Sequence, residues 1–189
     1  MELILASSSS RRQDLLEEAG ILFRVDAPLV DEFDSHSRPE LSPLDLALAN
    51  ALLKAETVAL RHPQGIILAA DTIVVCDGRT LGKPLDLTEA HQMLRWLSGK
   101  THEVITAVVW LRVQEKILHE HIARTRVTFR PLDDAAIQNY LGKVHVLDKA
   151  GAYAYQEHGH EVVERVEGSK TNVIGLPMEI VQHWWSTLR

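Results

Sequence analysis

Hydrophobic and polar positions alternate along this chain in two patterns, one typical of strands and one typical of helices. Apolar, β-branched runs predict strands at 3–6, 23–27, 66–76, 104–113 and 117–129. Apolar residues at helical spacing predict helices over 10–19, 44–60, 88–97 and 133–141, and a last helix that Pro177 opens. Because strands and helices are interspersed, the order predicts an α/β protein with a mixed sheet covered by helices.

Local signals refine these boundaries. Ser10 and Gln13 fit a capping box, and Thr88 and Asp133 stand where N-caps belong. The dipeptide at 77–78, Asp-Gly, predicts a hairpin after the strand at 66–76. Short strands are expected at 151–156 and 162–166, and a loop at 31–43.

Length and composition fit one globular domain over 1–189. The 189 residues are 46% apolar and 24% charged, which excludes disordered and collagen-like chains. Twenty basic against 26 acidic residues give a net charge of −6, so a general nucleic-acid binder is not expected. The lone Cys76 excludes an intrachain disulfide. No signal peptide and no apolar run of about 20 residues is visible, so we expect a cytoplasmic protein without a membrane partner.

Asp71 is the most unusual residue, because it interrupts the apolar, strand-like run at 66–75. A buried carboxylate without a partner is costly, so a cation, a metal or a cleft is expected beside it. The alternative is that Asp71 ends one strand and caps a bend.

The segment Ser7-Ser8-Ser9-Ser10-Arg11-Arg12 leads from the first strand into the first helix. Hydroxyls, free backbone N–H groups and the positive end of a helix dipole together suit a phosphate. Arg11 and Arg12 add planar donors for phosphate oxygens. Taken by itself, the segment favours the alternative of an ordinary capped helix with solvated arginines, because serines are common at helix starts.

Two lysines and two acids complete the candidates. Lys54 lies among Ala and Leu in a helix, so its ammonium must reach solvent or an acid. Lys83 lies in Gly-Lys-Pro, where the backbone is restricted. Asp31 and Glu32 could supply oxygen ligands to Mg²⁺. For each lysine alone, a solvated side chain is the preferred interpretation.

Histidine pairs at 119/121 and 158/160 have a spacing that could place two imidazoles on one strand face. No other residue at zinc-site spacing accompanies them, so exposed histidines are the preferred interpretation.

Taken together, the motifs resemble those of the Maf family of nucleoside triphosphate pyrophosphatases over nearly the whole chain. They are, in order, LASSSSRRQDLL at the start, VDE at 30–32, Lys54-Ala55, AADTIVV at 69–75, GKP at 82–84, SGKTHEVITAV at 98–108, DKAGAYAYQ at 148–156 and EGSKTNVIGLP at 167–177. The family usually has proline where this chain has Ser10.

The resemblance implies an ITPase-like α/β fold, in which an elongated mixed sheet forms two lobes with a cleft between them, and it implies a homodimer. It also implies hydrolysis of a nucleoside triphosphate to the monophosphate and pyrophosphate with Mg²⁺ or Mn²⁺. By analogy, Asp71 is the catalytic base, and Glu32 and Asp71 hold the metal. The expected substrate-binding residues are Ser7, Ser9, Arg11, Arg12, Lys54, Thr72, Lys83 and Gln156.

Three combinations, Arg-Arg at 11–12, Asp-Thr at 71–72 and AGAYxxQ at 150–156, resemble the branch acting on dTTP, UTP and modified pyrimidine nucleotides. Two alternatives remain. One is a purine-specific enzyme acting on ITP, XTP or 7-methyl-GTP. The other is a non-catalytic, nucleotide-binding regulator of septum formation.

Overall fold

The computed structural model describes residues 2–188, which form two compact units. Unit 1 contains the chain up to Asp71, Thr106–Ala123 and the chain from Gly175. Unit 2 contains Thr72–Ile105 and Arg124–Ile174. Three long strands, β3 (Ile66–Cys76), β5 (Thr101–Arg112) and β6 (Ile117–Phe129), contribute residues to both units.

The strands form a seven-stranded mixed sheet. Its order is β2-β1-β3-β5-β6-β7, and β4 pairs with β3. The strands β1 (Leu3–Leu5) and β2 (Arg24–Val25) are parallel, as are β1 and β3, whereas β3–β4 and β6–β7 are antiparallel. The α/β prediction with a mixed sheet flanked by helices is therefore confirmed.

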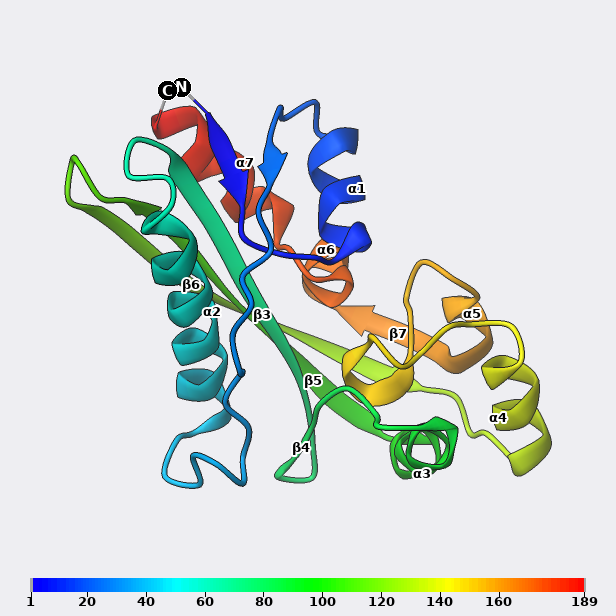
Figure 1. Ribbon diagram of the computed structural model, residues 1–189. Helices are drawn as coiled ribbons and strands as arrows, with labels where there is room; N and C mark the ends of the chain where they lie inside the picture. The colour runs from blue at the N-terminus through cyan, green and yellow to red at the C-terminus, as the bar shows by residue number, and fades with distance from the viewer. Residues whose placement is uncertain (1, 189) are drawn as a thin grey trace. The chain divides into compact units, whose positions relative to one another are not determined.

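Unit 1 places three helices around its strands. They are α1 (Ser10–Glu18), α2 (Pro43–Ala59) and α7 (Met178–Thr187). Helix α2 runs beside β3 (Figure 1), and α7 packs on β5 and β6 through stacked rings of Trp185 on Trp110 and of Trp184 on His119. A β-branched, apolar sequence explains why β3 begins and ends where predicted.

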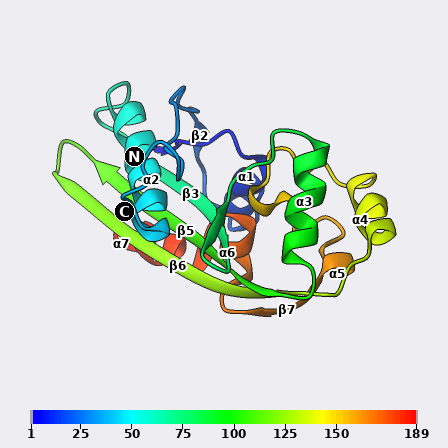
Figure 2. The ribbon, with the colours of Figure 1, turned by 90° about the horizontal axis from the view of Figure 1, so that it is seen from below.

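Unit 2 contains β4 (Arg79–Leu81), β7 (Val163–Glu167), α3 (Leu87–Leu97), α4 (Asp134–Leu141), and the short helices α5 (Gly159–Val162) and α6 (Lys170–Ile174). Helices α3 and α4 pack side by side, and α5 lies against β7 (Figures 1 and 2). The hairpin at 77–78 is confirmed: Asp77 and Gly78 both have positive φ, as a tight turn between β3 and β4 requires.

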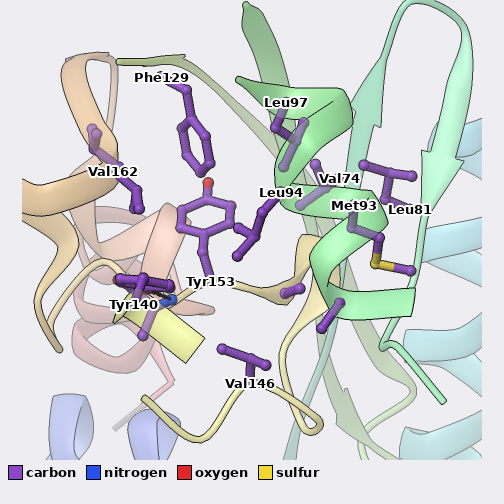
Figure 3. Packing of buried hydrophobic residues seen from close by; sticks show 14 of the residues in the cluster. Val74, Leu81, Met93, Leu94, Leu97, Phe129, Tyr140, Val146, Tyr153 and Val162 are labelled. Atoms are coloured by element: carbon purple, nitrogen blue, oxygen red, sulfur yellow. Dashed lines mark hydrogen bonds between the residues drawn. The ribbon is translucent and has the colours of Figure 1, made fainter. Parts of the chain in front are cut away.

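The core of unit 2 is mainly aliphatic, and the aromatic side chains of Phe129, Tyr140 and Tyr153 belong to it. Tyr153 lies at its centre, with its hydroxyl toward the ring of Phe129, and the two rings meet edge to face at 4.9 Å (Figure 3). His102 is buried beside them, and its Nε2 atom lies 3.0 Å from the Tyr153 hydroxyl oxygen, within hydrogen-bond distance. Burial lowers the pKa of His102 to about 4, so the ring is neutral in the folded protein.

Two predicted caps are wrong. Helix α1 begins at Ser10 with Ser9 as N-cap, and no side chain caps it, so the Ser10–Gln13 box does not form. Helix α3 is capped by Asp86 instead of Thr88, and Asp86 accepts from the Glu89 N–H at 2.8 Å. The predicted cap of α4 is confirmed, since Asp133 accepts from the backbone N–H at the third helical position.

The strand predicted at 151–156 is also wrong. Residues 150–152 form a short 3-10 turn in which Gly151 and Ala152 have positive φ. A Cβ on Gly151 would approach the Val74 side chain to 3.1 Å, so the close approach as well as the backbone angle favours glycine. The neighbouring prediction at 162–166 is confirmed as β7, shifted by one residue. The short helices α5 and α6 were not predicted.

None of the helices within residues 2–188 combines the length and the apolar character that crossing a membrane would need.

Candidate active site

Asp71 occupies the middle of β3, with strand on both sides. It therefore neither ends a strand nor caps a bend, and that alternative is wrong. The residue is 5% exposed, and its neighbours Ala69 and Ala70 are fully buried. Such a carboxylate needs partners in order to remain ionised.

The partner comes from α2. The Lys54 Nζ donates to Asp71 Oδ1 at 2.7 Å, and the same Nζ lies 3.0 Å from Glu32 Oε2. Lys54 is buried, whereas the Glu32 side chain is 38% exposed. One ammonium thus joins a buried carboxylate on a strand to a more accessible one in the loop before α2. The alternative in which Lys54 reaches only solvent is wrong.

A fourth residue, Asn50, belongs to this group and was not predicted. Its Nδ2 lies 3.5 Å from Asp71 Oδ2, and its amide also bonds the backbone of Phe33. The available signal was its position, because Asn50 lies one helical turn before Lys54 on the buried face of α2. Asp71, Lys54, Glu32 and Asn50 are called the Lys54 cluster below.

Electrostatics within the Lys54 cluster favour an ionised Asp71. Burial alone would raise the pKa of Asp71, but the Lys54 ammonium opposes this as a nearby charge and as a hydrogen-bond donor. The Arg12 guanidinium adds to the effect of Lys54, and the pKa of Asp71 lies below its ordinary value. At neutral pH Asp71 is therefore a carboxylate able to accept a proton.

Arg12 is the second cation held inside unit 1, with 9% of its surface exposed. Its Nη1 donates to Ser7 Oγ and its Nε to the Gly175 carbonyl, both at 3.0 Å. Burial lowers the pKa of Arg12 while the charge of Asp71 raises it, and a guanidinium remains protonated in either case. The solvated-arginine alternative is wrong for Arg12.

Ser7 also shapes the start of α1. Its hydroxyl accepts from the Ser9 N–H at 3.2 Å, and Ser9 is the N-cap residue. Arg11 follows in the first turn, half-buried, and its charge lowers the pKa of Arg12. Ser7, Ser9, Arg11 and Arg12 therefore form one segment around the N-terminus of α1, where anions are favoured.

The other predicted residues belong to unit 2. Thr72 follows Asp71 directly in β3 and is half-buried, whereas Lys83 and Gln156 are exposed in irregular segments. The two irregular segments are connected, because the Gly151 N–H donates to the Gly82 carbonyl at 3.0 Å. Near Gln156, the Tyr140 hydroxyl accepts from the Ala154 N–H at 3.0 Å and donates to the Ala154 carbonyl at 3.3 Å.

No group of three or more His, Cys, Asp or Glu side chains among residues 2–188 is arranged to hold a metal ion. Within the first histidine pair, the His119 ring stacks on Trp184 with ring centroids 3.8 Å apart.

A buried carboxylate paired with a lysine, in the same unit as a buried arginine and a serine-rich helix N-terminus, is typical of a site for an anionic substrate. The chain matches the Maf-like protein family over residues 2–187. It is 45% identical over 180 residues to the dTTP/UTP pyrophosphatase of Akkermansia muciniphila, covering 95% of this chain and 92% of that protein.

Two further relatives bear the same name. The dTTP/UTP pyrophosphatases of Symbiobacterium thermophilum and Syntrophomonas wolfei are each 46% identical to this chain. Each match covers 94% of this chain, and it covers 89% of the Symbiobacterium protein and 92% of the Syntrophomonas protein. The chain therefore belongs to the Maf-like protein family.

Proposed function

We propose that this protein is a nucleoside triphosphate pyrophosphatase that hydrolyses dTTP and UTP to the monophosphate and pyrophosphate. The observation that carries the proposal is the buried Asp71 held ionised by Lys54, in a chain whose relatives are named dTTP/UTP pyrophosphatases. Removing such nucleotides, including modified pyrimidines, would be a house-cleaning role in the nucleotide pool.

In the reaction, a water oxygen attacks the α-phosphorus, and the bond from that phosphorus to the oxygen bridging the α- and β-phosphates breaks. Asp71 accepts the proton that the water loses as the new P–O bond forms. Pyrophosphate leaves with the bridging oxygen. Lys54 keeps Asp71 deprotonated before the attack, and both side chains are held by packing and by their mutual hydrogen bond.

The substrate's negative charge requires concentrated countercharge in a protein of net charge −6. Arg12 is pre-oriented by Ser7 and the Gly175 carbonyl, so little side-chain freedom is lost when it binds phosphate. Arg11, Lys83 and the α1 N-terminus with Ser7 and Ser9 are the further phosphate contacts. Positioning and charge stabilisation would supply most of the rate gain.

Two carboxylates of the Lys54 cluster would hold a divalent cation together with substrate phosphate, because no three His, Cys, Asp or Glu side chains among residues 2–188 form a metal site by themselves. Glu32 and Asp71 come from different segments, yet both carboxylates contact one ammonium, and Mg²⁺ commonly binds through one or two carboxylates together with phosphate and water. Glu32 and Asp71 would hold Mg²⁺ or Mn²⁺. When bound, the ion would neutralise phosphate charge and polarise the α-phosphorus.

Base selection is assigned to Thr72 and Gln156, whose hydroxyl and amide can hydrogen-bond the polar edge of uracil or thymine. A site built from such groups rejects a base lacking the matching donors and acceptors more strongly than an apolar pocket does.

The experiment is a nucleotide panel with Mg²⁺ or Mn²⁺, measuring pyrophosphate and monophosphate together. The panel contains dTTP, UTP, CTP, ATP, GTP, ITP, XTP and 7-methyl-GTP. Preference for dTTP and UTP is expected, and Asp71→Asn should fold but lose at least ~10²-fold in turnover. A preference for ITP, XTP or 7-methyl-GTP would refute pyrimidine selection, and no pyrophosphate from any nucleotide would favour a non-catalytic regulator. The homodimer stays a prediction. Sedimentation equilibrium tests it by measuring the molecular mass of the protein in solution.

A further inference from the structure

Asn50 is a buried polar residue in a helix face made mostly of alanine and aliphatic side chains. It is 2% exposed and lies in α2 one turn before Lys54. A buried amide is costly unless its donors and acceptor are bonded. Asn50 forms those bonds with two segments outside its own helix, and both carry residues of the Lys54 cluster.

The first segment is the loop before α2. The Asn50 Oδ1 accepts from the Phe33 N–H at 2.8 Å, and its Nδ2 donates to the Phe33 carbonyl at 2.9 Å. One side-chain amide thus pairs with both backbone groups of a single residue, as a neighbouring strand would. Residues 26–34 are irregular, so this pairing fixes a main chain that has no helix or strand to hold it. Glu32 is the adjacent residue.

The second segment is β3. The Asn50 Nδ2 lies 3.5 Å from Asp71 Oδ2, while Lys54 Nζ holds the other carboxylate oxygen, Oδ1, at 2.7 Å. Two residues one turn apart on α2 therefore approach the two oxygens of one carboxylate from the same helix. Asn50 contacts both Asp71 and the residue next to Glu32.

We infer that Asn50 is a positioning residue that holds the Glu32 backbone in register with Asp71, so that the two carboxylates converge on one point. The inference rests on the proposed function, since convergence matters when both acids act on one substrate and its cation. Asn50 acts through Glu32, so its loss should weaken cation binding and lower turnover while leaving nucleotide affinity at saturating cation nearly unchanged.

The test combines Asn50→Leu with Glu32→Gln in a double-mutant cycle. Pyrophosphate release from dTTP and UTP is measured as a function of Mn²⁺ and of nucleotide. Asn50→Leu should lower turnover or raise the half-saturating Mn²⁺ concentration by roughly 10–100-fold, the usual effect of losing a group that orients a metal ligand. KM at saturating Mn²⁺ should stay within about threefold of wild type.

The cycle separates positioning from general damage. If Asn50 acts through Glu32, the double variant is no worse than Glu32→Gln alone, because the carboxylate to be positioned is already gone. Multiplicative losses would overturn the inference, and so would wild-type turnover and Mn²⁺ dependence in Asn50→Leu. Ser37→Ala is the matched control: it removes a hydroxyl from the exposed turn of the same loop, where Ser37 Oγ accepts from the Asp34 N–H, and it should leave both constants unchanged.

Hydrogen exchange provides a readout independent of activity. The Phe33 amide should exchange at least about tenfold faster in Asn50→Leu than in wild type or Ser37→Ala, because its acceptor is gone. Unchanged exchange would overturn the inference. Asn50→Ala repeats every measurement without the branched side chain, so a folding failure of Asn50→Leu does not end the test. A wild-type protein that releases no pyrophosphate would refute the proposed function. Asn50 variants that behave like an active wild-type protein would refute only the role of Asn50.

Discussion

Replacing Lys54 with methionine would remove one ammonium from between two carboxylates. Asp71 would keep its burial but lose the donor at 2.7 Å, and Glu32 would lose its contact at 3.0 Å. Methionine retains much of the lysine stem, so packing against the alanines of α2 is little changed. The dominant effect should therefore be an uncompensated charge in the interior of unit 1.

The expected loss follows from burial. The side chains of Lys54 and Asp71 are each only 8% exposed, and removing one partner of a buried ion pair costs about 3–5 kcal/mol of unfolding free energy. The Glu32 contact adds less, because that side chain is 38% exposed and screened by solvent. Lys54→Met should therefore lower the unfolding free energy at pH 7 by about 3–5 kcal/mol.

Urea unfolding followed by circular dichroism measures this loss. Lys83→Met is the control, because Lys83 is exposed and its replacement should change the unfolding free energy by less than about 0.5 kcal/mol. The double variant Lys54→Met with Asp71→Asn should recover most of the stability, because the carboxylate that lost its lysine partner is then replaced by a neutral amide. A loss below about 1 kcal/mol in Lys54→Met, or a double variant no more stable than the single one, would refute an ion pair of this strength.

Three other outcomes are expected. Tyr140→Phe should lower the unfolding free energy by about 1–3 kcal/mol in urea titrations, because the buried N–H and carbonyl of Ala154 lose their partner; stability equal to wild type would contradict this. The pKa of His102 is about 4 when folded and about 6.5 when unfolded, so stability is full above pH 6.5 and falls as pH drops toward 4. The fall between pH 7 and pH 5 should be about 2 kcal/mol and should disappear in His102→Gln; an identical fall in that variant would assign it to other groups. Lys83→Ala should raise KM for dTTP or lower turnover through lost phosphate contacts, and unchanged steady-state kinetics would remove Lys83 from the site.

Much of the fold could be predicted because its signals are local. The β-branched run at 66–76 predicts both ends of β3, and the Asp-Gly dipeptide at 77–78 predicts the turn that follows this strand. The failures lie where tertiary contacts decide. Apolar residues at 151–156 suggest a strand, but Gly151 must approach Val74 closely and adopts positive φ instead. Ser10 was predicted to cap α1, although its neighbour Ser9 takes that position.

For the site, an acid in an apolar strand and a lysine in an apolar helix each signalled a missing partner, and the structure pairs Asp71 with Lys54. The orientation of Arg12 by the Gly175 carbonyl joins residues 163 positions apart, which no local pattern encodes. Asn50 was missed for the same reason, since its importance depends on the path of an irregular loop.

The tryptophans are divided unevenly between the two units. Trp96 is the one tryptophan in unit 2, and it lies under the Lys100 ammonium at 3.9 Å, whereas Trp110, Trp184 and Trp185 belong to unit 1. Emission from a Trp96→Phe variant would therefore arise from unit 1 alone. Comparing its denaturation midpoint with that of the backbone signal would reveal whether the two halves melt together or one after the other.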